Sequence, residues 1–362
     1  MKVLSFATVA LLAVTSAQIS AAEFTKYVGF IKTKSNPVTL AADPDGNLYY
    51  GCSPATLERE VVFIQNPNSK IGNEEAAGTV VENISFASGR IIQGLGVTSD
   101  GTKLFMTGDN GGGTPTQNVR RYDITSNPGE NGPSYSWNRN TEFENTFAAT
   151  DTGHGLSLRF GGIAIISESG NGLIAAQTFQ GIVYFDFNGN KVGTAVTGLP
   201  NYHREPVYNS QHNLIYPLRN GENSAEMLRG YISGIDPVNG GGTWNPGVLI
   251  SDGAWNTATA GAAQHGFYYA AENQLVTLDT LNTLATPASD AKIRVWNTGD
   301  DGKTFTLAYS LSPSQDDAVA PNWSTVSDAV ITNNRLYVSV SGKTGIYVYE
   351  APGANVDNWS LY

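Results

Sequence analysis

A strand–turn–strand pattern recurs six times along this chain of 362 residues. In each copy an apolar run leads into a tight polar turn, and a second apolar run rich in Leu or Tyr follows. One copy alone cannot bury both of its faces, so the copies must pack against one another. The two clearest copies are Leu40–Tyr50 and Leu95–Met106, and weaker copies begin near Gly162, Pro206, Gly266 and Asp328.

Four strand-like runs can be assigned to each of the first five copies, separated by turns rich in the 40 glycines of the chain. The pattern predicts an all-β fold, a six-bladed β-propeller of four-stranded antiparallel blades. The sixth copy supplies only three runs, so we expect the N-terminal strand at 24–31 to complete it and close the ring. Seven blades is the alternative, with part of the additional blade at 141–158. Helical periodicity is nearly absent, and 73–77 is the one short helix candidate.

The first 22 residues have the features of a cleaved secretory signal peptide. Lys2 supplies a positive charge, residues 3–14 form an apolar segment too short to span a bilayer, and Ser20-Ala21-Ala22 is a small-residue cleavage site. We expect a secreted or periplasmic protein with one propeller domain at 23–353 and a C-terminal tail at 354–362. No later stretch has about 20 consecutive apolar residues, so we expect no membrane insertion.

The formal net charge of −11 argues against nucleic acids and anionic membranes as partners. A small molecule, a glycan, a peptide or an extracellular protein remains as the class of partner, and we expect a monomer. The one cysteine, Cys52, cannot form an intrachain disulfide. The stability of the fold must therefore come from its hydrophobic core.

Three short segments carry resemblances to known propeller families. The turns at Asp43–Tyr49 and Ser99–Phe105 resemble the innermost hairpins of NHL-type and gluconolactonase-like six-bladed propellers, which implies a fold and no particular substrate. The segment Thr298–Phe305 is similar to the Asp-box turn of sialidase-like propellers. In those families this turn joins the third and fourth strands of a blade, away from the active site, so the resemblance implies a turn and not the activity.

Aligning the copies on the leucines of their second strands brings the leading ends of the innermost strands together at one opening of the central channel. Glu205, His265 and Asp328 in this ring are candidate acid–base groups, and Glu205 and Asp328 are also candidate ligands of Ca²⁺. Alternatively, the ring side chains pair with one another and line a water-filled channel. The polar ring members are Thr39, Gln93 (or Gly94), Arg159, Arg204, Glu205, His265 and Asp328 (or Ser327).

Side chains beside the ring are candidates for ligand binding, because arginines clamp carboxylates or phosphates and exposed tryptophans stack on sugar rings. We favour a propeller that binds a ligand or partner at the central-channel face. The alternative, implied by the gluconolactonase resemblance, is a calcium-dependent lactonase, hydrolase or lyase with its site at the channel mouth. That group's carboxylate–Asn–Asp metal set does not map onto the ring. The ligand-binding candidates are Arg159, Arg204, His203, Trp255 and Trp323.

Overall fold

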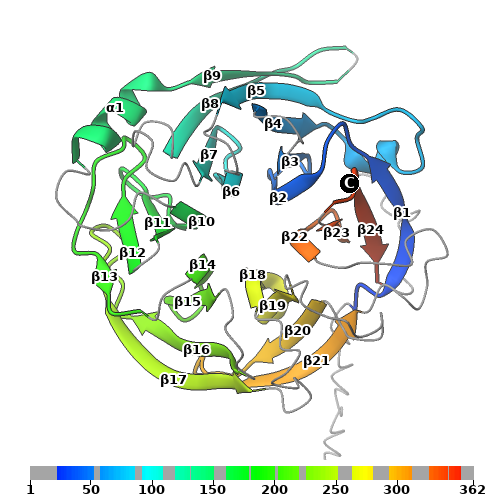
Figure 1. Ribbon diagram of the computed structural model, residues 1–362. Helices are drawn as coiled ribbons and strands as arrows, with labels where there is room; N and C mark the ends of the chain where they lie inside the picture. Colours follow the sequence, from blue (N-terminus) through cyan, green and yellow to red (C-terminus); the bar gives the residue numbers. More distant parts are fainter. Residues whose placement is uncertain are drawn as a thin grey trace, which may run out of the picture.

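The chain forms a ring of six four-stranded antiparallel sheets around a central axis, as Figure 1 shows for the computed structural model. The predicted all-β, six-bladed propeller is therefore confirmed, and the alternative of seven blades is wrong. The predicted signal peptide at 1–22 and tail at 354–362 lie outside the described residues. The structure describes residues 23–52, 58–85, 92–108, 119–130, 132–150, 160–178, 181–199, 203–219, 226–251, 263–279, 293–311, 326–340 and 342–351.

The strands of each blade follow one another outward from the channel. The innermost strands are β2 (Pro37–Ala42), β6 (Ile92–Val97), β10 (Phe160–Ser167), β14 (His203–Asn209), β18 (Ala263–Tyr269) and β22 (Val326–Thr332). The second strands are β3 (Leu48–Cys52), β7 (Lys103–Gly108), β11 (Leu173–Thr178), β15 (Leu214–Arg219), β19 (Gln274–Asp279) and β23 (Arg335–Val340).

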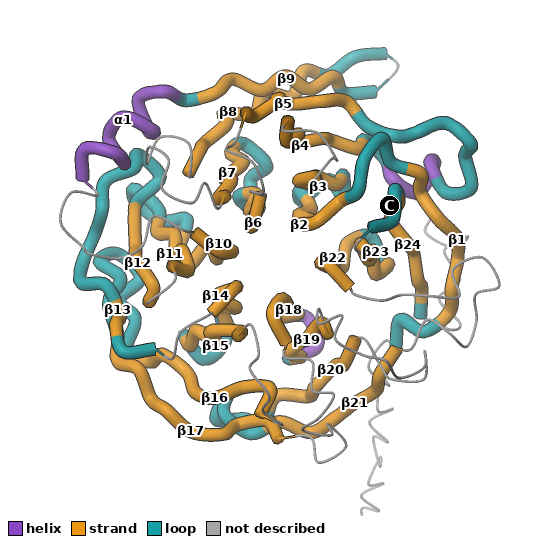
Figure 2. Tube along the Cα trace, viewed as in Figure 1, coloured by secondary structure: helices purple, strands orange, loops and turns teal. Residues whose placement is uncertain are grey.

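The third and outermost layers complete the blades, and in Figure 2 they form the rim of the disc. The third strands are β4 (Glu58–Ile64), β8 (Val119–Asn127), β12 (Gly181–Phe185), β16 (Glu226–Ser233), β20 (Ile293–Thr298) and β24 (Gly345–Glu350). The outermost strands are β5 (Thr79–Ser85), β9 (Ser134–Arg139), β13 (Val196–Thr197), β17 (Thr243–Ser251), β21 (Phe305–Leu311) and β1 (Lys26–Lys32).

The hydrophobic core lies between neighbouring blades. Tyr49 and Phe63 of the first blade share one buried cluster with Leu104 and Met106 of the second. Both faces of β3, β11, β12 and β24 are buried, which explains their continuous apolar sequences. Each blade is thus stabilised by the blades on either side of it.

The N-terminal strand closes the ring, as the sequence predicts. Strand β1 pairs antiparallel with β24, from Lys26 opposite Glu350 to Lys32 opposite Gly345. The Lys26 ammonium lies 2.7 Å from the Glu350 carboxylate. Just before this strand, Phe24 is 1% exposed, and its ring contacts Tyr269 of the fifth blade edge-on. The closure therefore ties the sixth blade to the fifth as well.

One helix was not expected, and one expected helix is absent. Helix α1 (Thr141–Thr150) lies at the rim beside the second and third blades (Figure 2), where Phe143 and Phe147 pack edge-on against Phe185. Asn140 caps it by accepting a hydrogen bond from the Phe143 amide at 2.9 Å. The candidate at 73–77 is irregular backbone with a bend and an isolated bridge from Ala77 to Thr33. The neighbouring helical turn is the 3-10 helix η1 (Pro67–Lys70), and η3 (Ala270–Glu272) is another.

Within the described part of the chain, no helix is long and apolar enough to cross a membrane.

Candidate functional site

All six innermost strands have a shift in pairing register at the ring position; in five it comes just before that position, and in β10 it lies between Phe160 and Ile163. The shift sets the ring members opposite their second strands, with Glu205 opposite Leu218, His265 opposite Leu278 and Asp328 opposite Ser339. Where the sequence left two choices, the register selects Gly94 over Gln93 and Asp328 over Ser327. A bulge of this kind re-aims the side chains next to it.

Glu205 and His265 are in direct contact across the junction of the fourth and fifth blades. Glu205 Oε2 lies 3.2 Å from His265 Nδ1 and accepts a hydrogen bond from the Gly266 amide at 3.0 Å. The side chains are only 14% and 11% exposed. This carboxylate therefore links β14 to β18.

Asp328 makes the same link between the sixth and first blades. Its Oδ2 accepts hydrogen bonds from the Thr39 hydroxyl at 3.0 Å and from the Leu40 amide at 2.7 Å. Its Oδ1 accepts a third from the Ala329 amide at 2.7 Å. In both links one oxygen binds the ring side chain and the following amide of the next blade. Part of the polar ring is thus used to join blades, as the alternative interpretation of the sequence holds.

The three predicted acid–base groups influence one another electrostatically. The pKa of Asp328 is raised from 3.8 to about 7, chiefly by burial and also by the negative charge of Glu205, while His265 acts to lower it. The structure therefore brings Glu205, His265 and Asp328 into one electrostatic unit.

Glycines occupy the ring position in the second and third blades, where the innermost strands come close together; in the third blade this residue is Gly162 and not the predicted Arg159. A Cβ atom on Gly94 would lie 2.7 Å from Gly162 Cα, and one on Gly162 would lie 2.8 Å from Glu205 Cγ. Neither distance is tolerated by a real side chain. The glycines leave the space into which the Glu205 side chain extends.

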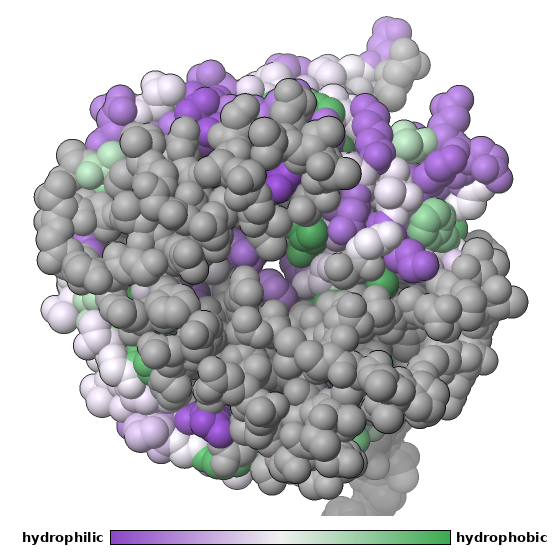
Figure 3. All heavy atoms as spheres, in the orientation of Figure 1, coloured by the Kyte–Doolittle hydropathy of each residue, from purple (hydrophilic) through white to green (hydrophobic). Residues whose placement is uncertain are grey.

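A cavity of about 600 Å³ fills the channel and is lined by residues of all six innermost strands or their turns. It extends from Glu205 and Asp328 to Ser210 and Ala270, at the opposite ends of these strands. Figure 3 shows an opening near the centre of one face of the molecule, with hydrophilic residues around it. The ring residues therefore stand at one end of this cavity, and Ser210 and Ala270 stand at the other. Its size is that of a pocket for a small organic molecule.

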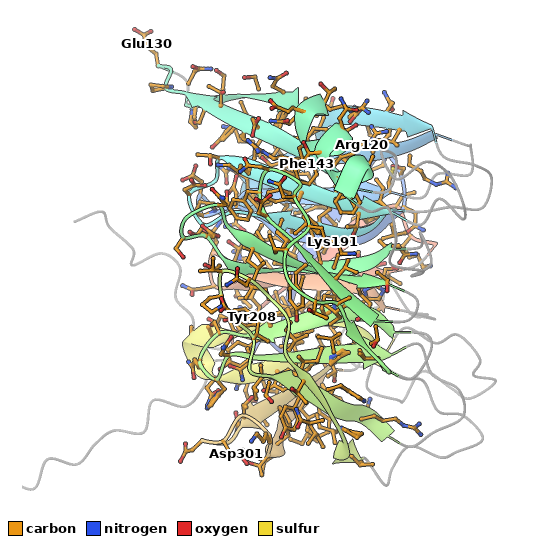
Figure 4. All side chains as sticks on the ribbon, turned by 90° about the vertical axis from the view of Figure 1, so that its left-hand side faces the viewer. Arg120, Glu130, Phe143, Lys191, Tyr208 and Asp301 are labelled. Carbon is orange, nitrogen blue, oxygen red and sulfur yellow. The ribbon has the colours of Figure 1, made fainter. Side chains whose placement is uncertain are left out.

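Aromatic side chains form part of the cavity wall, and the sequence analysis did not single out Tyr208. Tyr208 and Tyr268 line it from equivalent positions in neighbouring blades. Each phenol donates to an asparagine five residues later, Tyr208 to Asn213 at 3.1 Å and Tyr268 to Asn273 at 2.6 Å. That repeated Tyr–Asn spacing is a signal in the sequence that could have identified the pair. Tyr208 lies toward the same face of the disc as Glu130 and Asp301 in Figure 4.

Another cavity residue that the sequence analysis missed is Glu168, at the end of β10. Its two carboxylate oxygens accept hydrogen bonds from the Ser99 amide at 2.7 Å and the Ser99 hydroxyl at 2.6 Å. Both residues line the cavity, away from the ring. This contact joins the second and third blades.

The structure does not describe the side chains of the five predicted ligand-binding residues. The backbones of His203 and Arg204 belong to β14, and their side chains are not described. Arg159, Trp255 and Trp323 lie outside the described residues. A role in binding stays a prediction for all five.

The predicted calcium ligands do not form a metal site with other described residues. Across the described ranges, no group of three or more His, Cys, Asp and Glu side chains is arranged to hold a metal ion. Both oxygens of Asp328 face N–H or O–H donors. A role of Glu205 and Asp328 as calcium ligands stays a prediction.

The Asp-box-like segment forms the turn between β20 and β21, the third and fourth strands of the fifth blade. Asp301 Oδ1 accepts hydrogen bonds from the amides of Lys303 and Thr304 at 2.8 and 3.0 Å and from the Thr304 hydroxyl at 3.0 Å. This position matches what the resemblance implies. It does not by itself assign a family.

No protein-family model matches the chain, and no curated protein matches its sequence. Among solved structures, it resembles Raptor from Chaetomium thermophilum with a TM-score of 0.50 and 10% sequence identity, covering 91% of this chain and 29% of the Raptor chain. A hydrazine synthase from Kuenenia stuttgartiensis aligns with a TM-score of 0.48 and 13% identity, covering 86% of this chain and 76% of that one. The likeness to Raptor shows the fold alone, and membership of the NHL or gluconolactonase-like group stays a prediction.

Proposed function

We propose that this chain is an exported propeller that binds a small ligand in its central cavity. A propeller fold is in general a scaffold for binding ligands or partners. The observation that carries the proposal is the cavity of about 600 Å³, to which every blade contributes lining residues. Small-molecule sites are typically concave and mostly apolar, with a few fixed polar groups. Here the fixed groups are Glu205 and Asp328, which their hydrogen bonds hold in place.

The cavity favours a small molecule over a glycan or protein bound across the outer face. Its wall is mostly apolar, with half-buried side chains such as Ile165, Phe267 and Val330. A ligand that fills an apolar cavity gains binding free energy, because its apolar surface is removed from water. A larger glycan, a peptide or a protein would reach the cavity only with one end.

The site can be tested with a soluble fragment library screened by ligand-observed NMR. Fragments that bind are retested on Ala164→Trp, which fills the cavity from its half-buried wall, and on Val238→Trp, which alters a 63% exposed surface position. We expect binding to persist in Val238→Trp and to be lost in Ala164→Trp. Binding that survives in a folded Ala164→Trp protein would place the site elsewhere.

Export is a separate part of the proposal. The predicted cleavage after Ala22 would leave Glu23 as the first residue, directly before the buried anchor Phe24. Mass spectrometry of the protein recovered from culture medium or periplasm should give the mass of the chain that begins at Glu23. Recovery of the full-length chain in the cytoplasm alone would contradict it.

A further inference from the structure

We propose that the cavity selects organic cations, in which a positively charged amine is attached to an apolar or aromatic body. This inference rests on the proposed function, because it names the class of ligand for the same site. It is carried by the charge of the cavity lining, by one carboxylate oxygen that accepts no hydrogen bond from the described side chains, and by the aromatic wall.

The described acidic and basic side chains that line the cavity are all carboxylic acids. They are Glu168, Glu205 and Asp328, and among the described lining residues there is no lysine or arginine. A cleft with low-dielectric walls and one sign of charge concentrates ions of the opposite sign. The net charge of −11 strengthens the attraction. The same lining repels carboxylates and phosphates.

Glu205 is the acid best placed to contact a ligand. Its Oε2 takes the hydrogen bonds from Gly266 and His265, whereas Oε1 accepts none from the side chains and backbone groups that the structure describes. Asp328 has both oxygens engaged, and so does Glu168. Glu205 Oε1 can therefore accept a hydrogen bond from an ammonium group while Oε2 keeps the carboxylate fixed.

The wall on the same side of the cavity suits the rest of such a ligand. Tyr208 and Tyr268 line it from the fourth and fifth blades, the two blades that Glu205 joins, and Phe267 lies beside them. Aromatic rings contact apolar groups well, and their faces attract cations. Their phenol oxygens are committed to Asn213 and Asn273, which fixes the ring positions.

Three probes with one body and different charge test the inference: 2-phenylethylammonium, 2-phenylethanol and 3-phenylpropanoate. Isothermal titration calorimetry measures each on the wild type and on Glu205→Gln, which keeps the size of the side chain and removes its charge. Glu130→Gln is the matched control, because it makes the same change at the tip of the β8–β9 hairpin (Figure 4). Thermal unfolding confirms that each variant is folded.

We expect the cation to bind the wild type roughly tenfold more tightly than the alcohol, with the anion weakest. Glu205→Gln should remove most of this preference and leave the affinity for the alcohol within about twofold, and Glu130→Gln should change neither. Equal affinities for cation and alcohol, or a preference that survives Glu205→Gln, would overturn the inference. If the alcohol binding is then lost in Ala164→Trp, the proposed function still stands. If no probe binds, or if the probes bind Ala164→Trp as tightly as the wild type, both the proposed function and the inference of cation selectivity fail.

Discussion

Individual atoms at the ring position decide how closely the blades approach. Gly162 lies where any side chain would collide with Glu205. The carboxylate of Asp328 accepts three hydrogen bonds, two of them from the neighbouring blade. Gly162 is constrained by the space available for a side chain, and Asp328 by the burial of its charge. Each constraint predicts a measurable effect of substitution or of pH.

Gly162→Ala should destabilise the fold by about 1–3 kcal/mol, because the new methyl group would lie 2.8 Å from Glu205 Cγ and 3.1 Å from its Oε1. Chemical denaturation measures this change in the free energy of unfolding. Gly247→Ala is the control, since nothing lies within 4 Å of a Cβ atom there, and its effect should stay within about 0.5 kcal/mol. Equal effects of the two substitutions would refute the steric argument.

The raised pKa of Asp328 predicts that stability falls as the pH rises. Its pKa is about 7 in the folded chain and 3.8 ordinarily, so the folded state holds the proton more tightly than the unfolded state. The stability that this group contributes is complete below about pH 4 and is lost as the pH rises through about 7. Melting temperatures measured across this range check the slope.

Asp328→Asn provides the comparison, because an amide stays neutral over that range. It should lower stability overall, since its NH₂ group would face one of the amide donors of Leu40 or Ala329. The difference in melting temperature between wild type and variant should therefore shrink as the pH rises. A difference that is constant with pH would show that Asp328 does not titrate there.

Strand β1 is the element on which closure of the ring depends. It covers the edge of β24, and its neighbour Phe24 reaches the fifth blade, where the Tyr309 hydroxyl lies 3.2 Å from the Phe24 amide nitrogen. An uncovered strand edge invites pairing with other chains. Loss of this strand would therefore affect both stability and solubility.

Phe24→Ala should lower the free energy of unfolding by about 3 kcal/mol, because it removes a buried aromatic ring that the surroundings cannot replace. Hydrogen exchange should speed up first at β24, whose outer edge β1 covers. Lys26→Ala is the control: the lysine side chain is 62% exposed, so loss of its ion pair should cost less than about 1 kcal/mol. Unchanged exchange at β24 would contradict a closing role for this segment.

The order of elements could be predicted from the sequence because turns and strands are local features. Gly46 and Gly101 adopt φ values of +79° and +69°, which glycine tolerates, so their turns mark the hairpins plainly. Because the sixth copy supplies only three strands, the sequence predicts that the N-terminal strand β1 completes this blade. Helix α1 was missed because one helix is weak against a background of strands, although Asn140 followed by acidic residues is a helix-start signal.

The candidate site could be predicted only as a set of positions. The leucine alignment gave the correct register for Glu205, His265 and Asp328. It could not show which oxygen atoms bind the neighbouring blade, because those contacts join residues far apart in the sequence, such as Leu40 and Asp328. Only the structure distinguishes a carboxylate oxygen that binds the neighbouring blade from one that can bind a ligand.

The whole molecule is held together without a disulfide. Cys52 is the one cysteine of the chain, and it is buried beside Glu60. Burial raises the pKa of its thiol, which keeps it protonated and unreactive. The melting temperature should therefore be the same with and without a thiol reductant. A reductant-dependent shift would reveal a disulfide between chains, which the burial of Cys52 argues against.

The pairing of β1 with β24 also constrains the order in which the molecule can assemble. Lys26 and Glu350 are 324 positions apart in the chain, so the first strand to be synthesised finds its partner last. Contacts of such long range form slowly, and until they form the edges of β1 and β24 stay open to other chains. A chain that crosses a membrane unfolded and folds afterwards has both strands available at once. If this chain is exported as proposed, closure of the ring is the final and slow step of its folding.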